Sequence, residues 1–380
     1  MFFTPEKRIG IKLQSPSKSL WSTLKKAYFL NKDFKKFWLK LNKDNLDKNL
    51  VNMTNKFISS ESSDWVSRFW NHCQILHYKN LVTLSANNSV KKDIRDYGRH
   101  IYFEKTDLNN VCEELKDNVI PPSFNIFQKH KPSMNQYDSV SYNLATVILY
   151  QRLKHLADKY YGLINKEMYN KYSYNVDINE KKISQHFLFT ILELEKIIKI
   201  IDVKKKDLKI LEFGAGYGRT ANLFLSLSSE VKYVIVDIPV AICVSYDEIK
   251  KNYPGKKVLM AVDINDHQSM NDALEENDVV LVFPHQLKFF KKKYFDLSLM
   301  IGITLEMEPK DVKRYMEYVD LLSNNLYMKV FKYSGLPFSF YKVYRHDVRE
   351  DYFIGKTWKQ LFLETGLETD NISHSAYKVE

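Results

Sequence analysis

Beyond Lys204 the sequence breaks into six short apolar runs, and this alternation is the feature that most restricts the fold. Turn residues bound the runs, and helical stretches separate most of them. Short apolar strands that alternate with helices are typical of a parallel sheet covered by helices. The runs are DLKILEFGAG, VKYVIVDIP, KKVLMAVDI, DVVLVFP, YFDLSLMIG and NLYMKVFK. We therefore predict a mostly parallel α/β sheet for this half of the chain.

The residues before this half show a different periodicity. From Ser19 to about residue 200, apolar and aromatic residues recur at spacings of three and four, which predicts amphipathic helices. Three prolines in PPSFNIFQKHKPS predict a long loop at 121–133. The chain has 380 residues, more than one domain usually holds. We expect an all-helical cap or acceptor domain over 1–185 and the α/β domain over 186–380.

Charge and cysteine content restrict the setting of the protein. The 57 basic and 46 acidic residues give a net charge of +11, but the lysines are spread along the chain and favour an anionic partner only weakly. Cys73, Cys112 and Cys243 are too far apart for a disulfide framework or a CxxC metal site, which fits a reducing compartment. No segment approaches the roughly 20 apolar residues of a membrane helix, and the N-terminus lacks a signal-peptide core. We expect a cytoplasmic protein without a membrane span.

A glycine-rich turn follows the first apolar run. ILEFGAGYGRT lies where a strand passes into a helix, so that backbone N–H groups and the positive helix end face a ligand. A dinucleotide fingerprint GxGxxG needs its third glycine where this chain has Arg219. The phosphate-binding pattern GxxxxGK[ST] is absent as well. The turn therefore predicts another kind of ligand.

An acid two residues before a GxGxG completes the pattern, as Glu212-Phe213-Gly214-Ala215-Gly216-Tyr217-Gly218. This pattern resembles the first motif of class I S-adenosylmethionine-dependent methyltransferases. The resemblance implies that the cofactor is S-adenosylmethionine and that the product is S-adenosylhomocysteine. It also implies that Glu212 helps to orient the amino group of the cofactor. The residues whose backbone would approach the methionine part are Gly214, Ala215, Gly216 and Gly218.

The second apolar run ends in Asp237, about 20 residues after the glycine turn begins. An acid at the C-terminal end of this strand can accept hydrogen bonds from both hydroxyls of a ribose. A dehydrogenase would place an acid similarly, so Asp237 indicates a ribose more than a methyl donor. It could also cap the helix that starts at Pro239.

Three later segments point to one group within the methyltransferases. VVLVFPHQL, YFDLSLMIGITLEM and NLYMKVFK look like the sugar O-methyltransferases of bacterial surface-polysaccharide gene clusters. That family carries a GxGYG turn, a VDIP-type strand, an FxxPHQL-like segment and a Glu-Met pair, which match 216–218, 236–239, 283–287 and 306–307 here. The likeness spans about residues 208–331 and implies a Rossmann-like, doubly wound methyltransferase domain. Ile238, Phe283 and Pro284 then join the expected cofactor site.

The implied reaction is methyl transfer to a sugar hydroxyl, which needs alignment of the groups and a base for the hydroxyl proton. His285, Thr304 and Glu306 fall past the C-terminal ends of strands, where open α/β sheets bind ligands. His285 is the first candidate for the catalytic base, because neutral imidazole accepts a proton near pH 7. Glu306 is the second, although it could instead bind sugar hydroxyls or cap the helix near Pro309. Thr304 is expected to contact the substrate.

The segment 333–352 interleaves aromatic and charged residues, and we expect Tyr341, Arg345 and His346 to bind the acceptor. A solvated loop would explain this segment equally well. The expected acceptor is a sugar, a nucleotide-sugar or a polysaccharide of capsule or lipopolysaccharide biosynthesis. No metal site is predicted, because His72 and His77 are five residues apart and would not share a helix face. A need for a divalent ion and the oligomeric state stay open.

Other functions fit parts of the sequence. A nucleic-acid methyltransferase is not expected, because IGITLEM lacks the Pro-Pro-aromatic turn of base-methylating enzymes and no dense basic patch is visible. A nicotinamide-dependent oxidoreductase is disfavoured by Arg219 at the third-glycine position. The alternatives that remain are a methyltransferase that acts on a non-sugar small molecule or on nucleic acid, and a non-catalytic adenosyl-binding assembly module.

Overall fold

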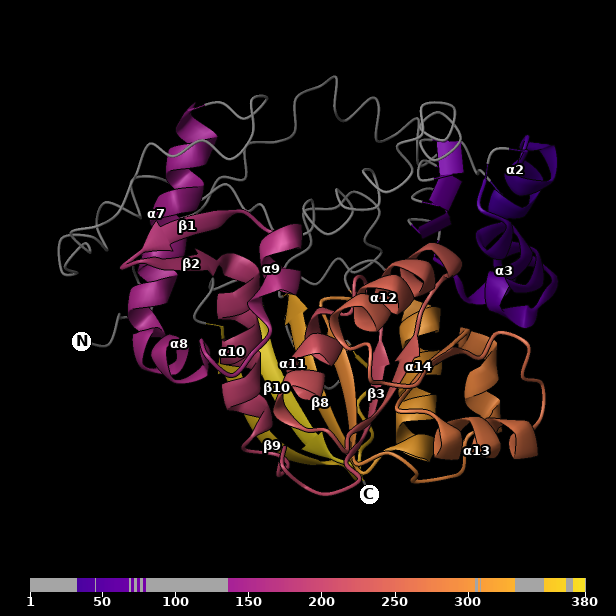
Figure 1. The fold of residues 1–380 in the computed structure, drawn as a ribbon. Helices are drawn as coiled ribbons and strands as arrows, with labels where there is room; N and C mark the ends of the chain where they lie inside the picture. The colour runs from indigo at the N-terminus through magenta and orange to yellow at the C-terminus, as the bar shows by residue number, and fades with distance from the viewer. Residues whose placement is uncertain are drawn as a thin grey trace.

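The computed structural model (Figure 1) describes residues 33–44, 46–67, 70–71, 74–75, 78–79, 136–304, 307, 309–331, 352–366 and 372–379. Its centre is an eight-stranded sheet with the order β5-β6-β4-β3-β7-β8-β10-β9. The strands are β3 (Lys209–Phe213), β4 (Lys232–Val236), β5 (Val258–Met260), β6 (Val279–Val282), β7 (Leu297–Ile301), β8 (Asn325–Phe331), β9 (Lys359–Thr365) and β10 (Ile372–Lys378).

The prediction of a mostly parallel α/β sheet is confirmed. The six apolar runs form β3 to β8, which pair in parallel. The sequence interpretation did not include β9 and β10. β10 pairs antiparallel with both β8 and β9, so it is the reversed strand of this sheet. Continuous apolar runs suit β3, β4, β6 and β7 because helices cover both faces of the parallel part.

Helices cover the sheet on its two faces, as a doubly wound fold requires. One core joins α10, α11 and α12 to Ile210, Tyr233 and Leu281 of the strands. A second core joins α13 and α14 to the neighbouring residues Leu211 and Val234, which point the opposite way. The helices are α10 (Gln185–Ile197), α11 (Arg219–Leu227), α12 (Pro239–Asn252), α13 (His267–Glu276) and α14 (Pro309–Leu322).

The described residues before α10 form helices and one hairpin. They are α2 (Phe34–Lys40), α3 (Lys48–Ser59), the short helix η1 (Glu61–Trp65), α7 (Gln136–Arg152), α8 (Lys154–Tyr160), α9 (Lys166–Tyr172), β1 (Asn175–Ile178) and β2 (Lys181–Ser184). The expectation of an all-helical region over 1–185 is therefore wrong. Asn179 and Glu180 both have positive φ and form the two-residue turn that lets β1 and β2 pair.

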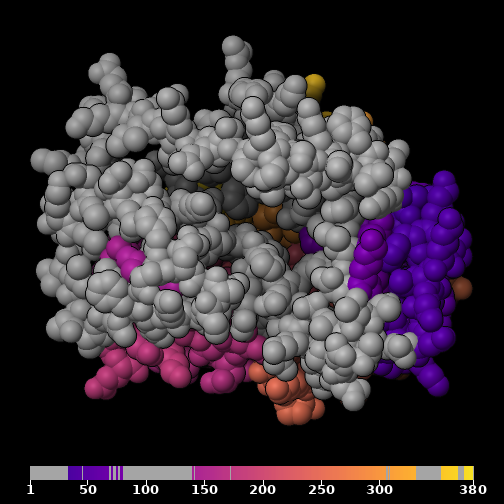
Figure 2. Space-filling model, turned by 90° about the horizontal axis from the view of Figure 1, so that it is seen from above, coloured from indigo at the N-terminus to yellow at the C-terminus, as the bar shows by residue number. Residues whose placement is uncertain are grey.

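The N-terminal elements lie on two sides of the sheet domain. In Figures 1 and 2, α2 and α3 (indigo) lie at one side and α7 (magenta) at the opposite side. Side chains of α2, α3 and α7 belong to the same hydrophobic core as β3 and β4. The boundary near residue 185 stays a prediction, and the loop expected at 121–133 lies outside the described residues. Among the helices described, none is long and apolar enough to span a bilayer.

Candidate functional site

The glycine turn between β3 and α11 adopts a backbone that favours glycine. Gly214 and Gly216 have φ of 70° and 59°, in the left-handed region. The N–H of Gly214 donates to the carbonyl of Val236 at the end of β4, over 2.9 Å. Gly218, with φ of 83°, is the N-cap of α11. A Cβ on Gly216 would meet no atom within 4 Å, so the backbone there borders open space that a ligand can enter.

Alanine at position 214 should destabilise the fold more than alanine at position 216. A methyl group on Gly214 would lie 2.4 Å from Cγ2 of Ile303. We expect Gly214→Ala to lower the free energy of unfolding by about 2–4 kcal/mol, through left-handed strain and overpacking. Gly216→Ala would suffer only the strain of a left-handed backbone, so it should lower the free energy of unfolding by about 1–2 kcal/mol. Urea unfolding of both variants measures the difference, and equal costs would contradict the contact with Ile303.

Asp237 follows β4 and folds back onto the glycine turn. Its Oδ2 accepts a hydrogen bond from the N–H of Gly216 at 3.1 Å, and its Oδ1 accepts one from the N–H of Ile238 at 2.8 Å. Burial nevertheless raises the pKa of Asp237 to about 7. A carboxylate has about four acceptor positions, so these bonds leave capacity for a ligand with hydroxyl groups.

Glu212 lies on β3 and is almost fully buried. Its Oε2 accepts a hydrogen bond from the hydroxyl of Tyr233 at 2.7 Å. Burial raises the pKa of Glu212 to about 7, although the bonds from Tyr233 and Thr220 and the charge of Arg219 lower it. Glu212 and Asp237 therefore put two carboxyl groups that titrate near neutral pH beside one turn.

Arg219 occupies the position of the third glycine in the dinucleotide pattern GxGxxG, and it forms part of a buried ion cluster. Its guanidinium donates hydrogen bonds to Oε1 of Glu193 on α10 at 2.9 Å and to the hydroxyl of Thr190 at 2.7 Å, and it forms an ion pair with Oε2 of Glu193 at 2.8 Å. Lys329 on β8 donates to the same carboxylate at 3.0 Å. The three charged side chains are buried. Arg219 thus ties the glycine turn to α10 and, through Glu193, to β8, whereas a dinucleotide-binding fold has a glycine at this position.

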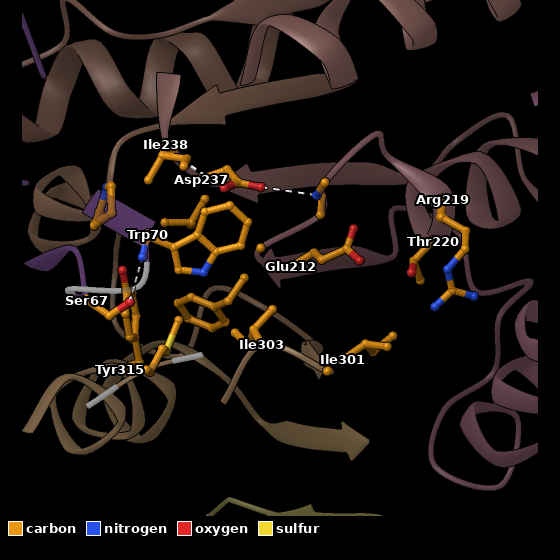
Figure 3. Close-up of a pocket in the computed structure, with 18 of the residues that line it drawn as sticks. Ser67, Trp70, Glu212, Arg219, Thr220, Asp237, Ile238, Ile301, Ile303 and Tyr315 are labelled. Atoms are coloured by element: carbon orange, nitrogen blue, oxygen red, sulfur yellow. Dashed lines mark hydrogen bonds between the residues drawn. The ribbon is translucent and has the colours of Figure 1, made fainter. Parts of the chain in front are cut away.

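A cavity of about 130 Å³ opens between these elements at the carboxyl ends of the strands. One end is apolar and aromatic, and the other holds the polar groups beside α11. In Figure 3, Trp70, Ile238 and Tyr315 lie at one side, Arg219 and Thr220 lie at the other, and Glu212 lies between them. The lining at the polar end also includes His186 and Tyr217, whose ring nitrogen Nδ1 and hydroxyl are 2.8 Å apart.

The aromatic wall comes from the N-terminal region, which the sequence analysis expected to form a cap or acceptor domain but in which it named no site residue. Trp65, Val66, Ser67 and Trp70 line the cavity. Trp65 lies at the end of η1, where the guanidinium of Arg314 stacks 4.7 Å from its ring. The ring of Trp65 also contacts Tyr315 and Tyr318 of α14. The two closely spaced tryptophans in SSDWVSRFW could have indicated an aromatic binding surface, but the sequence alone could not place this surface beside β4 and β7.

Contacts of η1 and of the end of α3 join this wall to the sheet domain. The N–H of His285 donates to Oγ of Ser62 at 3.0 Å, and that Oγ lies 2.7 Å from Nδ1 of His285. The ring of Phe57 contacts the ring of Phe283 edge to face at 5.2 Å. The N-terminal segment is therefore a packed wall of the cavity.

The structure gathers most of the expected cofactor residues around this cavity. They are Glu212, Gly214, Ala215, Gly216, Asp237, Ile238 and Pro284. Gly218 caps α11, and Phe283 is buried behind the lining against Phe57.

The expected catalytic and substrate residues are placed less favourably. His285 bonds Ser62 and is not among the lining residues, and burial lowers its pKa. Thr304 is buried outside the lining, and its Oγ1 has no hydrogen-bond partner among the described residues. Glu306, Tyr341, Arg345 and His346 lie outside the described residues. The roles of His285 and Glu306 as base candidates stay predictions.

Comparisons with known proteins show only distant likeness. Neither a protein-family model nor a curated protein matches the sequence. Among solved structures, a protein from Pyrococcus horikoshii is 17% identical over 52% of this chain and 92% of its own, with a TM-score of 0.34. A SAM-dependent methyltransferase from Aquifex aeolicus is 13% identical over 50% of this chain and 92% of its own, with a TM-score of 0.33.

A third solved structure is an O-methyltransferase family 2 protein from Planctomyces limnophilus in complex with apigenin. It is 9% identical over 52% of this chain and 61% of its own, with a TM-score of 0.34. Because these three TM-scores lie below 0.5, the functional assignment rests on the geometry of the site. In the described part of the chain, no three His, Cys, Asp or Glu side chains lie close enough together to hold a metal ion.

Proposed function

We propose that this protein is an S-adenosylmethionine-dependent O-methyltransferase whose acceptor is a sugar hydroxyl. The observation that carries the proposal is the pairing of Asp237 with the N–H of Gly216 over the open side of the glycine turn. This pairing holds a carboxylate, which would bind a ribose, beside a backbone that a ligand could approach. The cavity then extends from an apolar end to a polar end, as an adenosyl group joined to an amino acid requires.

The sheet argues against the nicotinamide alternative. In the usual dinucleotide-binding order the sixth strand lies directly beside the fifth. Here β10 is inserted between β8 and β9 and runs antiparallel to both. The third glycine, which allows a pyrophosphate-binding helix to pack closely on its strand, is replaced by Arg219 in an ion cluster.

The residues around the cavity fit the cofactor in named roles. Asp237 would accept hydrogen bonds from the ribose hydroxyls, and Glu212 would receive the amino group. Ile238, Pro284 and Trp65 offer apolar surface for the adenine. The bound cofactor would supply a methyl group on a sulfonium, whose sulfur would leave as the neutral thioether of S-adenosylhomocysteine when the acceptor oxygen bonds to the methyl carbon. The protein would align the acceptor hydroxyl, exclude water through its aromatic wall and accept the hydroxyl proton at His285 or Glu306.

Two considerations support a sugar as the acceptor. The segments 283–287 and 306–307 resemble sugar O-methyltransferases. In addition, Trp70 and Tyr315 line the cavity with flat apolar ring faces, and Ser67 and Tyr315 bring hydroxyl groups to the same lining. A sugar ring has alternating apolar and polar surface, so this combination suits a sugar. A methyl-transfer assay should use free sugars, nucleotide-sugars and capsule fragments as acceptors. Transfer to a phenolic acceptor alone would instead favour the second candidate, a non-sugar small molecule, which the same aromatic wall would also accept.

Removing the carboxylate of Asp237 should weaken cofactor binding. We expect Asp237→Ala to reduce the affinity for S-adenosylhomocysteine by about 1.5–3 kcal/mol, the scale of a charged hydrogen bond. Isothermal titration at pH 8, where the carboxyl group is ionised, measures the loss. Asp272→Ala, at an exposed position of α13, is the matched control and should bind as the wild type does. Unchanged affinity in Asp237→Ala would reject the proposed cofactor site.

A further inference from the structure

The hydroxyl of Ser62 and the ring of His285 form a contact that joins the N-terminal region to the end of β6. Ser62 lies in η1 and is fully buried, whereas His285 lies in the short helix η2 (Pro284–Phe289) and is half-buried. The Oγ of Ser62 lies 2.7 Å from Nδ1 of His285 and also accepts the backbone N–H of His285 at 3.0 Å. Both elements border the cavity, because Trp65 and Pro284 line it.

The hydrogen of the Ser62 hydroxyl decides the tautomer of His285. The backbone N–H of His285 occupies one lone pair of Oγ, and the hydroxyl still has its own hydrogen to donate. Among the described residues, Nδ1 of His285 is the only acceptor within reach of that hydrogen. A fully buried hydroxyl hydrogen without an acceptor is costly. Nδ1 therefore accepts, and the proton of the neutral ring lies on Nε2.

The opposite tautomer does not fit this contact. If Nδ1 carried the proton, Nδ1 and the backbone N–H of His285 would both donate to Oγ, and the hydroxyl hydrogen of Ser62 would face no acceptor among the described residues. A doubly protonated ring would have the same defect. Burial and the charge of Lys288 also lower the pKa of His285, although the charge of Glu61 raises it. Lys288 and Glu61 form an ion pair with each other at 3.2 Å, so neither acts on the ring alone.

We propose that Ser62 holds His285 as the Nε2–H tautomer, so that His285 offers a hydrogen-bond donor and does not accept the proton of the acceptor hydroxyl. Ser62 occupies Nδ1, whereas Nε2 has no partner among the described residues. Ser62 acts through His285 and is therefore a positioning residue. Its hydroxyl is fully buried and is not presented as a nucleophile.

The consequence for catalysis rests on the proposed function. Of the two base candidates, His285 is set aside and Glu306 is left. The carboxylate of Glu306 would take the proton of the acceptor hydroxyl while the oxygen bonds to the methyl carbon and the sulfur leaves as a neutral thioether. The tautomer itself does not depend on the reaction, so it can be measured without any acceptor.

NMR of the full chain with ¹⁵N-labelled histidine measures the tautomer directly, because the unprotonated ring nitrogen resonates far downfield of the protonated one. At pH 8 the wild type should show an unprotonated Nδ1 and a protonated Nε2 in His285, in at least about tenfold excess over the other tautomer. His285→Gln identifies these signals among the 10 histidines. His267 is an internal control of the opposite kind. Its Nδ1 lies 3.0 Å from the carbonyl of Phe289, which can only accept, so Nδ1 of His267 carries the proton.

Two variants test whether Ser62 sets the tautomer. Ser62→Ala removes the hydroxyl, so the excess of the Nε2–H tautomer should fall several-fold and the shifts of the two ring nitrogens should move toward each other. Ser62→Thr restores a hydroxyl at the same position and should keep the wild-type pattern. Circular dichroism and melting curves establish that both variants fold. A folded Ser62→Ala with the wild-type ratio would overturn the role of Ser62.

The wild-type spectrum decides the main point without any variant, because a proton on Nδ1 of His285 or an even mixture overturns the proposal. The choice of base has its own test. Glu306→Gln should slow methyl transfer by about 10²–10⁴ while keeping the affinity for S-adenosylhomocysteine. Glu317→Gln, at an exposed position of α14, is the matched control. A normal rate in Glu306→Gln would overturn Glu306 as the base. If the wild type neither binds the cofactor nor transfers a methyl group, the proposed function fails, whereas the spectrum still decides the tautomer.

Discussion

Replacing Glu193 with alanine is expected to lower the free energy of unfolding by about 3–5 kcal/mol, because it leaves two buried cations without their carboxylate. Glu193 is fully buried and receives hydrogen bonds from both Arg219 and Lys329. These cations hold the pKa of Glu193 below its usual value, against the effect of burial. The stabilisation is therefore present above the unfolded-state pKa of glutamate and is lost as the pH falls below it.

Urea unfolding at pH 7 measures the effect of Glu193→Ala. The control is Lys329→Met, which leaves Arg219 and Glu193 as a neutral pair and should cost much less. Replacing all three residues with apolar side chains of similar size should recover most of the lost stability, since buried ion clusters are often no more stable than apolar packing. If Glu193→Ala and Lys329→Met lower the free energy of unfolding equally, then Glu193 is not the carboxylate that stabilises both buried cations.

The affinity for S-adenosylhomocysteine is expected to fall about 100-fold between pH 8 and pH 6, because two carboxyl groups must lose their protons before they can bind it. Burial raises the pKa of both Glu212 and Asp237 to about 7. Each group is mostly ionised at pH 8 and mostly protonated at pH 6. Each therefore contributes about a tenfold loss over this range, if the ligand binds only to the ionised form.

Calorimetric titrations from pH 6 to pH 8 in buffers of different ionisation enthalpy measure both the affinity and the protons released. Asp237→Asn removes one titrating group, so its affinity should be weaker at pH 8 but should change only about tenfold over the range. Affinity that does not depend on pH would show that neither carboxyl group must ionise, and would contradict the roles proposed for Glu212 and Asp237.

Local sequence signals identified the parallel part of the sheet and the side of the cavity that the glycine turn and Asp237 form. The six apolar runs, the glycine turn and Asp237 are each encoded by residues close together in the chain, whose periodicity and turn chemistry do not depend on distant packing. β9 and β10 lacked such a signal. β9 is an edge strand with mostly exposed residues, and Ser373, His374 and Ser375 in β10 are buried polar residues. His374, for example, lies 2.7 Å from the hydroxyl of Tyr327 on β8, a contact that no local pattern encodes.

The sequence by itself determined the α/β sheet, the glycine turn and the acid that lies beside this turn, because short-range sterics and hydrophobic periodicity specify these elements. Only the tertiary structure decided which distant residues complete the site. Arg219 and Glu193 are 26 residues apart, Lys329 and Glu193 are 136 apart, and Ser62 and His285 are 223 apart. Such contacts arise from the packing of the hydrophobic cores, which brings α10, β8 and η1 to the carboxyl ends of the strands. Burial among these elements then sets the charges of Glu212, Asp237 and His186, and so decides what the cavity can bind.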